Sequence, residues 1–198
     1  MRIPIIILAA GMSSRFGRNK LFETFGSATL IECIVSEALK SKAQRVIVVG
    51  GHDFERLWKT LEKFDCDIVY NEDFAKGQSY SVRKGVSAVD ELSDALMILP
   101  GDVALMNHEI IDSVINGFAN THAAIVSAGY RGRPGHPILF ERKLFSELKE
   151  IDEATRGLKK VVSNHLKEAV IIETSQASLF DIDTQNDLQR LDQIQSKI

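Results

Sequence analysis

The chain has 198 residues and a net charge of −3, with 44% hydrophobic and 26% charged residues. This length and composition are typical of a globular protein, and residues 1–198 are interpreted as a single domain because no Pro-, Gly- or Ser-rich linker divides them. The negative net charge argues against a general nucleic-acid or membrane binder, since neither phosphates nor anionic lipids would be attracted overall.

Two features bear on the cellular compartment. The apolar run from Ile3 to Ala10 could be mistaken for a signal peptide, but it is short and basic residues follow it closely, so we interpret it as a core strand. No run approaches the ~18 apolar residues of a membrane span. Cys33 and Cys66 lack CxxC spacing and neighbouring histidines, which favours buried free thiols and a reducing cytoplasm.

Strand and helix patterns alternate along the chain. Apolar runs predict strands at 5–8, 45–49, 68–70, 95–99, 123–128 and 137–140. Periodicity and capping residues predict helices at 29–40, 53–61, 81–89 and 107–118, and two more that end near His165. Short strands at 169–173 and 178–180 and a terminal helix capped by Thr184 follow. The alternation predicts an α/β fold, a three-layer α/β/α sandwich with a mostly parallel, Rossmann-like sheet.

The loop after the first strand concentrates groups that bind anions. Gly11 and Gly17 allow close backbone approach, and Arg15 and Lys20 supply cations that a triphosphate needs. The loop is not a P-loop, because five residues separate its glycines and Leu21 follows the lysine; it also lacks GxGxxG spacing. A basic surface loop would explain either cation alone, but not the whole arrangement.

A second polar segment precedes the helix predicted at 81–89. Asn71 is followed by Gly77, Ser79 and Ser81, and a helix start of this kind can hold a polar or anionic ligand with its free N–H groups. Ordinary helix capping by either serine is the alternative.

Acidic residues follow the strand at 95–99 and recur near the end of the chain. Asp102 comes directly after Gly101 at the expected carboxyl edge of the sheet, where a carboxylate can hold a hard cation. The alternative is a turn or capping aspartate. Strand-like alternation would place Asp181 and Asp183 on one face, where they could share a metal with Asp102. A capping turn made by Thr184 and Asp187 is the alternative there.

A turn rich in glycine and proline carries Arg131, Arg133 and His136. Together these side chains could form a compact anion site for the phosphate of an acceptor. A histidine before proline is more often structural, so no acid or base role is assigned to it.

The opening loop resembles the signature of nucleotidyltransferases that join an NTP's nucleotide to a phosphorylated acceptor, and within them it resembles the molybdenum cofactor cytidylyltransferases. The matching pattern is Leu8-Ala9-Ala10-Gly11-x-Ser13-x-Arg15-Phe16-Gly17-x-x-Lys20. The resemblance continues to about Leu188 and implies a fold of the nucleotide-diphospho-sugar transferase type. The tripeptide Ala9-Ala10-Gly11 is similar to the one that the CTP-using members have at this position, whereas the guanylyl-transferring relatives typically have Ala-Gly-Gly.

The resemblance also implies roles for individual residues. Arg15, Lys20 and Asp102 would be catalytic, and Asp102 and Asp183 would hold Mg²⁺. Nucleotide binding would fall to Leu8, Ala9, Ala10, Gly11, Ser13, Arg15, Lys20, Asn71, Gly77, Ser79 and Ser81. Acceptor binding would fall to His136 and Pro137, from a Gly-His-Pro element, with Arg133 beside them. Ala104 and Gln185 stand where the family usually has proline.

The expected reaction is transfer of CMP from CTP to molybdopterin, giving the cytosine dinucleotide cofactor and pyrophosphate with Mg²⁺. A covalent enzyme intermediate is not expected, because no Ser-His-Asp or Cys-His arrangement stands out. One alternative is a related transferase that uses GTP, a sugar phosphate or another small phosphorylated acceptor. Another is a nucleotide-binding chaperone of the cofactor without catalysis, which the Ala104 departure keeps open. A molybdoenzyme or its chaperone is a further expected partner.

Overall fold

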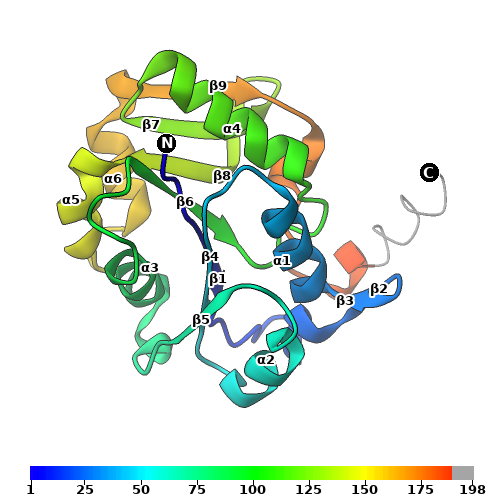
Figure 1. The fold of residues 1–198 in the computed structure, drawn as a ribbon. Coiled ribbons are helices and arrows are strands. Elements are labelled where there is room, and N and C mark those ends of the chain that lie inside the picture. The colour runs from blue at the N-terminus through cyan, green and yellow to red at the C-terminus, as the bar shows by residue number, and fades with distance from the viewer. Residues whose placement is uncertain (189–198) are drawn as a thin grey trace.

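The computed structural model describes residues 1–188 as strands and helices that alternate along the chain (Figure 1). The strands of the main sheet are β1 (Ile5–Ala9), β4 (Val46–Gly50), β5 (Asp67–Tyr70), β6 (Ala95–Pro100), β7 (Ile125–Tyr130), β8 (Arg133–Glu141) and β9 (Ala169–Glu173). A small hairpin is formed by β2 (Thr24–Phe25) and β3 (Ala28–Thr29). The α-helices are α1 (Leu30–Lys40), α2 (Phe54–Leu61), α3 (Gln78–Ser87), α4 (His108–Thr121), α5 (Phe145–Lys149) and α6 (Leu158–Asn164). Short 3-10 helices occupy Lys20–Phe22, Phe74–Lys76, Arg142–Leu144, Leu166–Glu168 and Gln176–Leu179.

The main sheet has seven strands in the order β5-β4-β1-β6-β8-β7-β9. Strand β1 lies at its centre and pairs in parallel with β4 and β6, so that Ile5 is opposite Val46 on one side and Met97 on the other. Only β8 runs against its neighbours, β6 and β7. The prediction of a mostly parallel sheet is confirmed, and the carboxyl ends of β1, β4, β5 and β6 share one edge.

Helices cover both faces of the sheet (Figure 1). One apolar core contains buried residues of α1, α2 and α4, and the other contains those of α3, α5 and α6. Successive residues of β1 alternate between these cores, since Ile5 and Ile7 belong to the first and Ile6 to the second. A strand with both faces buried explains why its sequence is continuously apolar, and the three-layer α/β/α prediction is confirmed.

Local signals place several helices where they were predicted. The Thr29 side chain accepts from the Glu32 N–H, and the Glu32 carboxylate accepts from the Thr29 N–H, so the predicted capping box starts α1. Asp53 precedes α2 as predicted, but it makes no side-chain cap bond. Its carboxylate instead accepts from the Asn19 side-chain amide at 3.2 Å.

The strand predicted at 178–180 is wrong. Residues Gln176–Leu179 form a 3-10 helix, because the Ser175 side chain accepts from the Ala177 N–H and Ser178 Oγ donates to the Ser175 carbonyl at 3.0 Å. Such local side-chain bonds compete with strand pairing. The two cysteines are free, as predicted, but half-buried rather than buried. Burial raises the pKa of the Cys66 thiol to about 11.

Candidate active site

The signature loop between β1 and the 3-10 helix Lys20–Phe22 is held by its own backbone and by apolar anchors. Ser13 adopts a left-handed conformation with φ of 50°, which lets its carbonyl accept from the Phe16 N–H at 2.9 Å. Its hydroxyl accepts from the Lys20 N–H at 3.3 Å. Phe16 and Leu21 are both 4% exposed and pack into the first core. These contacts fix the backbone from which the lysine side chain extends.

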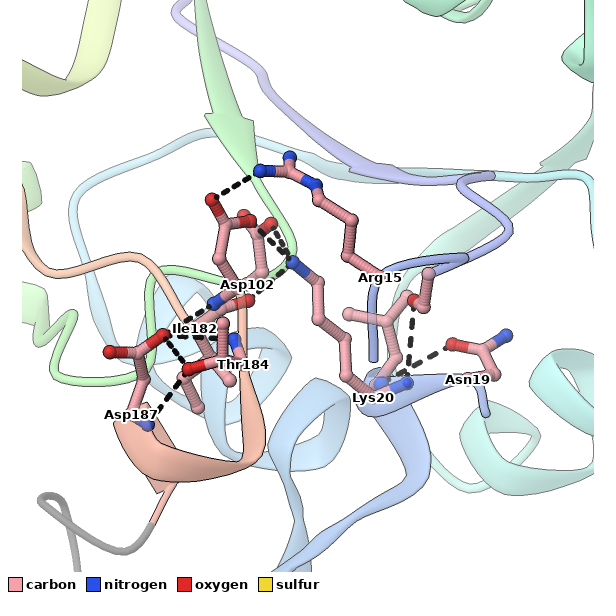
Figure 2. Close-up of polar contacts among 10 residues, drawn as sticks. Arg15, Asn19, Lys20, Asp102, Ile182, Thr184 and Asp187 are labelled. Atoms are coloured by element: carbon pink, nitrogen blue, oxygen red, sulfur yellow. Dashed lines mark hydrogen bonds and ion pairs between the residues drawn. The ribbon is translucent and has the colours of Figure 1, made fainter. Parts of the chain in front are cut away.

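Lys20 meets two carboxylates that come from distant parts of the chain (Figure 2). Its Nζ lies 2.7 Å from Asp102 Oδ2 and 3.4 Å from Asp183 Oδ1, and it also donates to the Ile182 carbonyl. Arg15 Nη1 lies 3.2 Å from Asp183 Oδ2. We call these four charged residues, Arg15, Lys20, Asp102 and Asp183, the Lys20 cluster. The structure thus brings together all the side chains predicted to be catalytic or to bind metal.

Exposure differs sharply within the cluster. The Lys20 side chain is 12% exposed and that of Asp102 is 25% exposed, whereas Asp183 and Arg15 are 46% and 77% exposed. The lysine is therefore the desolvated partner, and its contacts are less screened by water than those of the arginine. Arg15 can leave Asp183 for a ligand at little cost, because exposed ion pairs contribute only about 0–1 kcal/mol.

The segment after the last 3-10 helix docks onto the loop after β6. Ile182 is fully buried, and its N–H donates to the Asp102 carbonyl at 3.0 Å. Asp187 Oδ2 accepts from the N–H groups of Asp183 and Thr184, so the predicted capping turn is present. Residues 181–183 are not assigned to a strand, but their burial alternates as predicted, since Ile182 is buried between the two more exposed aspartates. Of these two carboxylates, Asp183 is the one that contacts Lys20.

The charges of the cluster also affect the pKa of Asp181. The pKa of its carboxyl is raised to about 6. Partial desolvation is the largest cause, the negative charges of Asp102 and Asp183 add to it, and the positive charge of Lys20 opposes it. A third carboxyl that ionises near neutral pH therefore lies beside two that are already paired.

A cavity of about 220 Å³ opens beside the cluster, and its lining includes Gly11, Ser13, Arg15, Lys20, Asp102 and Asp183. Residues of a glycine-containing loop, two cations and two carboxylates thus line one space. This combination suits a polyphosphate accompanied by a divalent cation, because cations hold the phosphate oxygens and carboxylates hold the metal.

The chemistry of the donors is compatible with Mg²⁺ or Mn²⁺. Both carboxylates already share one ammonium group, and carboxylate oxygens are the protein ligands these ions prefer. Within residues 1–188, no group of three or more His, Cys, Asp or Glu side chains is arranged to hold a metal alone. A metal here would take Asp102 and Asp183 as protein ligands and complete its shell with substrate phosphates and water.

The other predicted nucleotide-binding residues lie outside this cavity's lining. Ala9 and Ala10 are buried, and the Ala10 carbonyl accepts from the His52 N–H at 3.2 Å; Leu8 is half-buried. Asn71 is 2% exposed, and its amide donates to Ser81 Oγ at 3.0 Å. This pair ties the end of β5 to α3, so both side chains are engaged structurally.

Gly77 and Ser79 lie at the start of α3, where Ser79 lines a different cavity. That cavity also contains Glu153, whose carboxylate accepts from the Ser79 N–H at 2.6 Å. Glu153 was not predicted from the sequence, because no local pattern indicates its contact with Ser79, which lies 74 positions away. Asn19 was not predicted either, although an asparagine before a helical turn is a recognisable capping signal.

The predicted acceptor residues are spread along the start of β8. His136 lies near enough to Asp102 for that charge to raise its pKa, but burial has the larger effect and holds the pKa below its usual value. The imidazole is therefore neutral, and its Nδ1 is buried with no partner among the described residues. Pro137 is buried. Arg133 is exposed near the turn, whose N–H groups at Arg131 and Gly132 bind the Glu173 carboxylate.

An anion-binding loop and an acidic loop at the carboxyl edge of a parallel sheet place the protein among nucleotide-binding α/β proteins. Residues 5–170 match the MobA-like NTP transferase domain. The chain belongs to this family.

Known relatives agree with the fold. The bifunctional protein GlmU of Francisella tularensis subsp. novicida is 28% identical over 130 residues, which are 65% of this chain. The aligned part spans only 28% of GlmU. Among solved structures, the homologue of Rv0371c from Mycobacterium sp. strain JC1 has a TM-score of 0.85 at 23% identity, with both chains fully covered.

Two further structures are similar. A nucleotidyl transferase from Methanothermobacter, Mth528, has a TM-score of 0.84 at 21% identity and covers 100% of this chain and 99% of its own. Rv0371c from Mycobacterium tuberculosis in complex with manganese has a TM-score of 0.79 at 21% identity, covering 96% and 98%. These likenesses establish the fold as that of the nucleotide-diphospho-sugar transferase type. No helix within residues 1–188 is long and apolar enough to cross a membrane.

Proposed function

We propose that this protein transfers CMP from CTP to the phosphate of molybdopterin and releases pyrophosphate. The observation that carries the proposal is the Lys20 cluster, in which the signature lysine lies 2.7 Å from Asp102 beside a cavity lined by Gly11 and Ser13. Membership of the MobA-like NTP transferase family supports nucleotidyl transfer. The choice of CTP rests on Ala9-Ala10-Gly11, which is similar to the tripeptide that CTP-using members of the family have at this position.

The reaction needs no covalent enzyme intermediate. An oxygen of the acceptor phosphate attacks the α-phosphorus of CTP, a new P–O bond forms, and the bond to the β-phosphate oxygen breaks as pyrophosphate leaves. Catalysis then consists of alignment and of stabilising the negative charge that moves onto pyrophosphate. Lys20 and Arg15 supply the positive charge from the protein.

Asp102 and Asp183 would hold Mg²⁺. When bound, the ion neutralises charge on the phosphates and organises them for displacement. Lys20 must then exchange its carboxylate contacts for phosphate contacts, which its long flexible side chain allows. In the structure Lys20 contacts both of these carboxylates.

The acceptor would approach from the side of β8. Burial lowers the pKa of His136, and its buried Nδ1 has no partner among the described residues, so it can orient an acceptor through a hydrogen bond. Pro137 next to it is buried. Arg133 is exposed and available to the acceptor phosphate. We place the protein in the cytoplasm, where the free thiols of Cys33 and Cys66 would remain reduced.

The direct test measures pyrophosphate release from each of CTP, GTP, UTP and ATP with Mg²⁺ and molybdopterin. The expected result is release with CTP and formation of the cytosine dinucleotide. A preference for GTP would contradict the assignment of the base. Turnover with hexose 1-phosphates and none with molybdopterin would assign a sugar-phosphate acceptor instead. Nucleotide binding without pyrophosphate release for every acceptor would identify a non-catalytic chaperone.

A further inference from the structure

The residue before the signature lysine is a buried asparagine whose amide makes two hydrogen bonds. Asn19 is 7% exposed, and its Oδ1 accepts from the Leu21 N–H at 3.3 Å. Its Nδ2 donates to Asp53 Oδ2 at 3.2 Å. The first bond caps the 3-10 helix Lys20–Phe22 and could be made by an aspartate or a serine as well, whereas the second needs the amide N–H. The amide therefore links the signature loop to the loop between β4 and α2.

Asp53 adopts a conformation that its place at the start of α2 does not require. Its φ is 56°, in the left-handed region that residues other than glycine, asparagine and aspartate rarely adopt. An aspartate before a helix usually accepts from a backbone N–H of the first turn, but the Asp53 side chain makes no such bond. Its carboxylate accepts from the Asn19 amide instead. A less favoured backbone conformation together with a missing capping bond indicates a task outside the helix.

Two further contacts join the same regions of the chain. The His52 N–H donates to the Ala10 carbonyl at 3.2 Å, just past the ends of the paired strands β4 and β1. The Arg56 guanidinium lies 4.2 Å from the centre of the Phe22 ring, a distance at which the ring face attracts a cation. Residues at the start of α2 thus contact the chain on both sides of Lys20.

The backbone of Lys20 determines where its ammonium can lie. Its N–H donates to Ser13 Oγ at 3.3 Å, and its Nζ lies at the cavity beside Asp102. Because a lysine reaches its ligand through a long stem, a change of direction at its Cα moves the ammonium further than it moves the backbone. A displacement of about 1 Å in a catalytic group can cost roughly 100-fold in rate. The links on both sides of Lys20 therefore bear on its chemistry, although neither Asn19 nor Asp53 lines that cavity.

We propose that Asn19 and Asp53 are positioning residues that hold Lys20 where its ammonium can receive the phosphates of the nucleotide. The left-handed turn at Asp53 brings its carboxylate to the signature loop, the Asn19 amide donates to it, and Lys20 makes the contact with phosphate. The loop between β4 and α2 is thereby part of the phosphate site without lining its cavity. This inference rests on the phosphate role of Lys20 in the proposed function, but not on the identity of the base or of the acceptor.

The test measures binding of Mg-tripolyphosphate by calorimetry, because this probe carries the phosphates of a nucleoside triphosphate without its base. Asn19→Asp sets two carboxylates against each other at the link and should weaken binding about tenfold. In the double variant Asn19→Asp/Asp53→Asn the donor and the acceptor change places. Its net charge is that of the wild type, and the negative charge moves by about the length of one hydrogen bond. The double variant should therefore recover most of the lost affinity.

Asp53→Gly removes the carboxylate, and glycine adopts the left-handed backbone without strain. It should also weaken binding about tenfold, but in a Lys20→Met background it should cause no further loss, because both changes then act on the same contact. Asp65→Gly is the matched control, since it removes a carboxylate that precedes the amino end of β5, at the opposite edge of the sheet. Its affinity should equal that of the wild type, and circular dichroism checks that each variant is folded.

No recovery in the double variant, or an equal loss from Asp53→Gly with and without Lys20, would overturn the inference. Weaker binding in Lys20→Met together with wild-type binding in Asn19→Asp and Asp53→Gly would refute this inference alone. Undiminished affinity in Lys20→Met would remove the phosphate role of the lysine and both proposals with it. Recovery and non-additivity without CMP transfer to molybdopterin would refute the proposed reaction and leave this inference standing.

Discussion

Replacing Lys20 by methionine should change metal affinity and catalysis in opposite directions. In the structure the Lys20 ammonium forms ion pairs with Asp102 and Asp183, at 2.7 Å and 3.4 Å. A divalent cation that binds these carboxylates must displace it. Methionine keeps the length of the side chain but leaves both carboxylates without their shared cation, so Mn²⁺ should bind more tightly in the absence of nucleotide.

The magnitude follows from the exposure of the cluster. Exposed ion pairs contribute about 0–1 kcal/mol, and breaking a fully buried pair costs about 3–5 kcal/mol. The Lys20 side chain is 12% exposed, but its partners are 25% and 46% exposed. The expected gain in Mn²⁺ binding free energy therefore lies closer to the value for exposed pairs than to the value for buried pairs. About 1.4 kcal/mol corresponds to about a tenfold gain in Mn²⁺ affinity. Nucleotidyl transfer should fall by roughly 100- to 1,000-fold, as when an oxyanion donor is removed.

Titration of Mn²⁺ followed by electron paramagnetic resonance measures the free ion directly, without nucleotide or turnover. Lys167→Met is the matched control, because it removes the same charge next to the amino end of β9, at the opposite edge of the sheet. Mn²⁺ affinity that is unchanged or weaker in Lys20→Met would refute the assignment of Asp102 and Asp183 as metal ligands. Tighter Mn²⁺ binding with undiminished transfer would refute the phosphate role of the lysine.

Three other changes test the site and the fold. Asp102→Asn should abolish transfer while CTP binding measured without metal survives, and unchanged turnover would exclude a metal role. Glu32→Gln should lower the free energy of unfolding by roughly 2 kcal/mol at pH 7, because the Lys63 ion pair and the helix cap hold the pKa of Glu32 at about 2. That stability is present above pH ~4.5 and is lost as the pH falls toward 2, so urea titrations of the two proteins should converge there. Gly85→Ala would bring its Cβ to 2.5 Å from Ile6 Cγ2, and this overpacking should cost about 1–3 kcal/mol. Its Tm should fall by a few degrees, and an unchanged Tm would show that the core can adjust.

The ion pairs of the Lys20 cluster explain how two cations and two carboxylates can lie beside one cavity. The cations of the loop would repel each other and the carboxylates would do the same if either set stood alone. Arg15 and Lys20 instead neutralise Asp183 and Asp102. In the proposed function, binding of a metal and a triphosphate would exchange these ion pairs for others, in which the carboxylates pair with the metal and the cations pair with the phosphates.

Much of the fold was predictable from local sequence. The central strands are continuously apolar because both of their faces are buried, and Thr29 and Glu32 mark the start of α1 because they bond to each other's backbone. The strand predicted at 178–180 failed for the same kind of reason, since Ser175 captures a nearby N–H group and favours a 3-10 turn.

The sequence by itself therefore determined the elements, the parallel class of the sheet and the edge at which polar loops gather, because these depend on periodicity and on contacts within a few residues. Only the tertiary structure decided which loops meet. Lys20 and Asp183 are 163 positions apart, and Glu153 reaches Ser79 across 74 positions. Such contacts depend on strand order and on the docking of buried Ile182 beside Asp102, which arise from the packing of the whole core rather than from any local pattern.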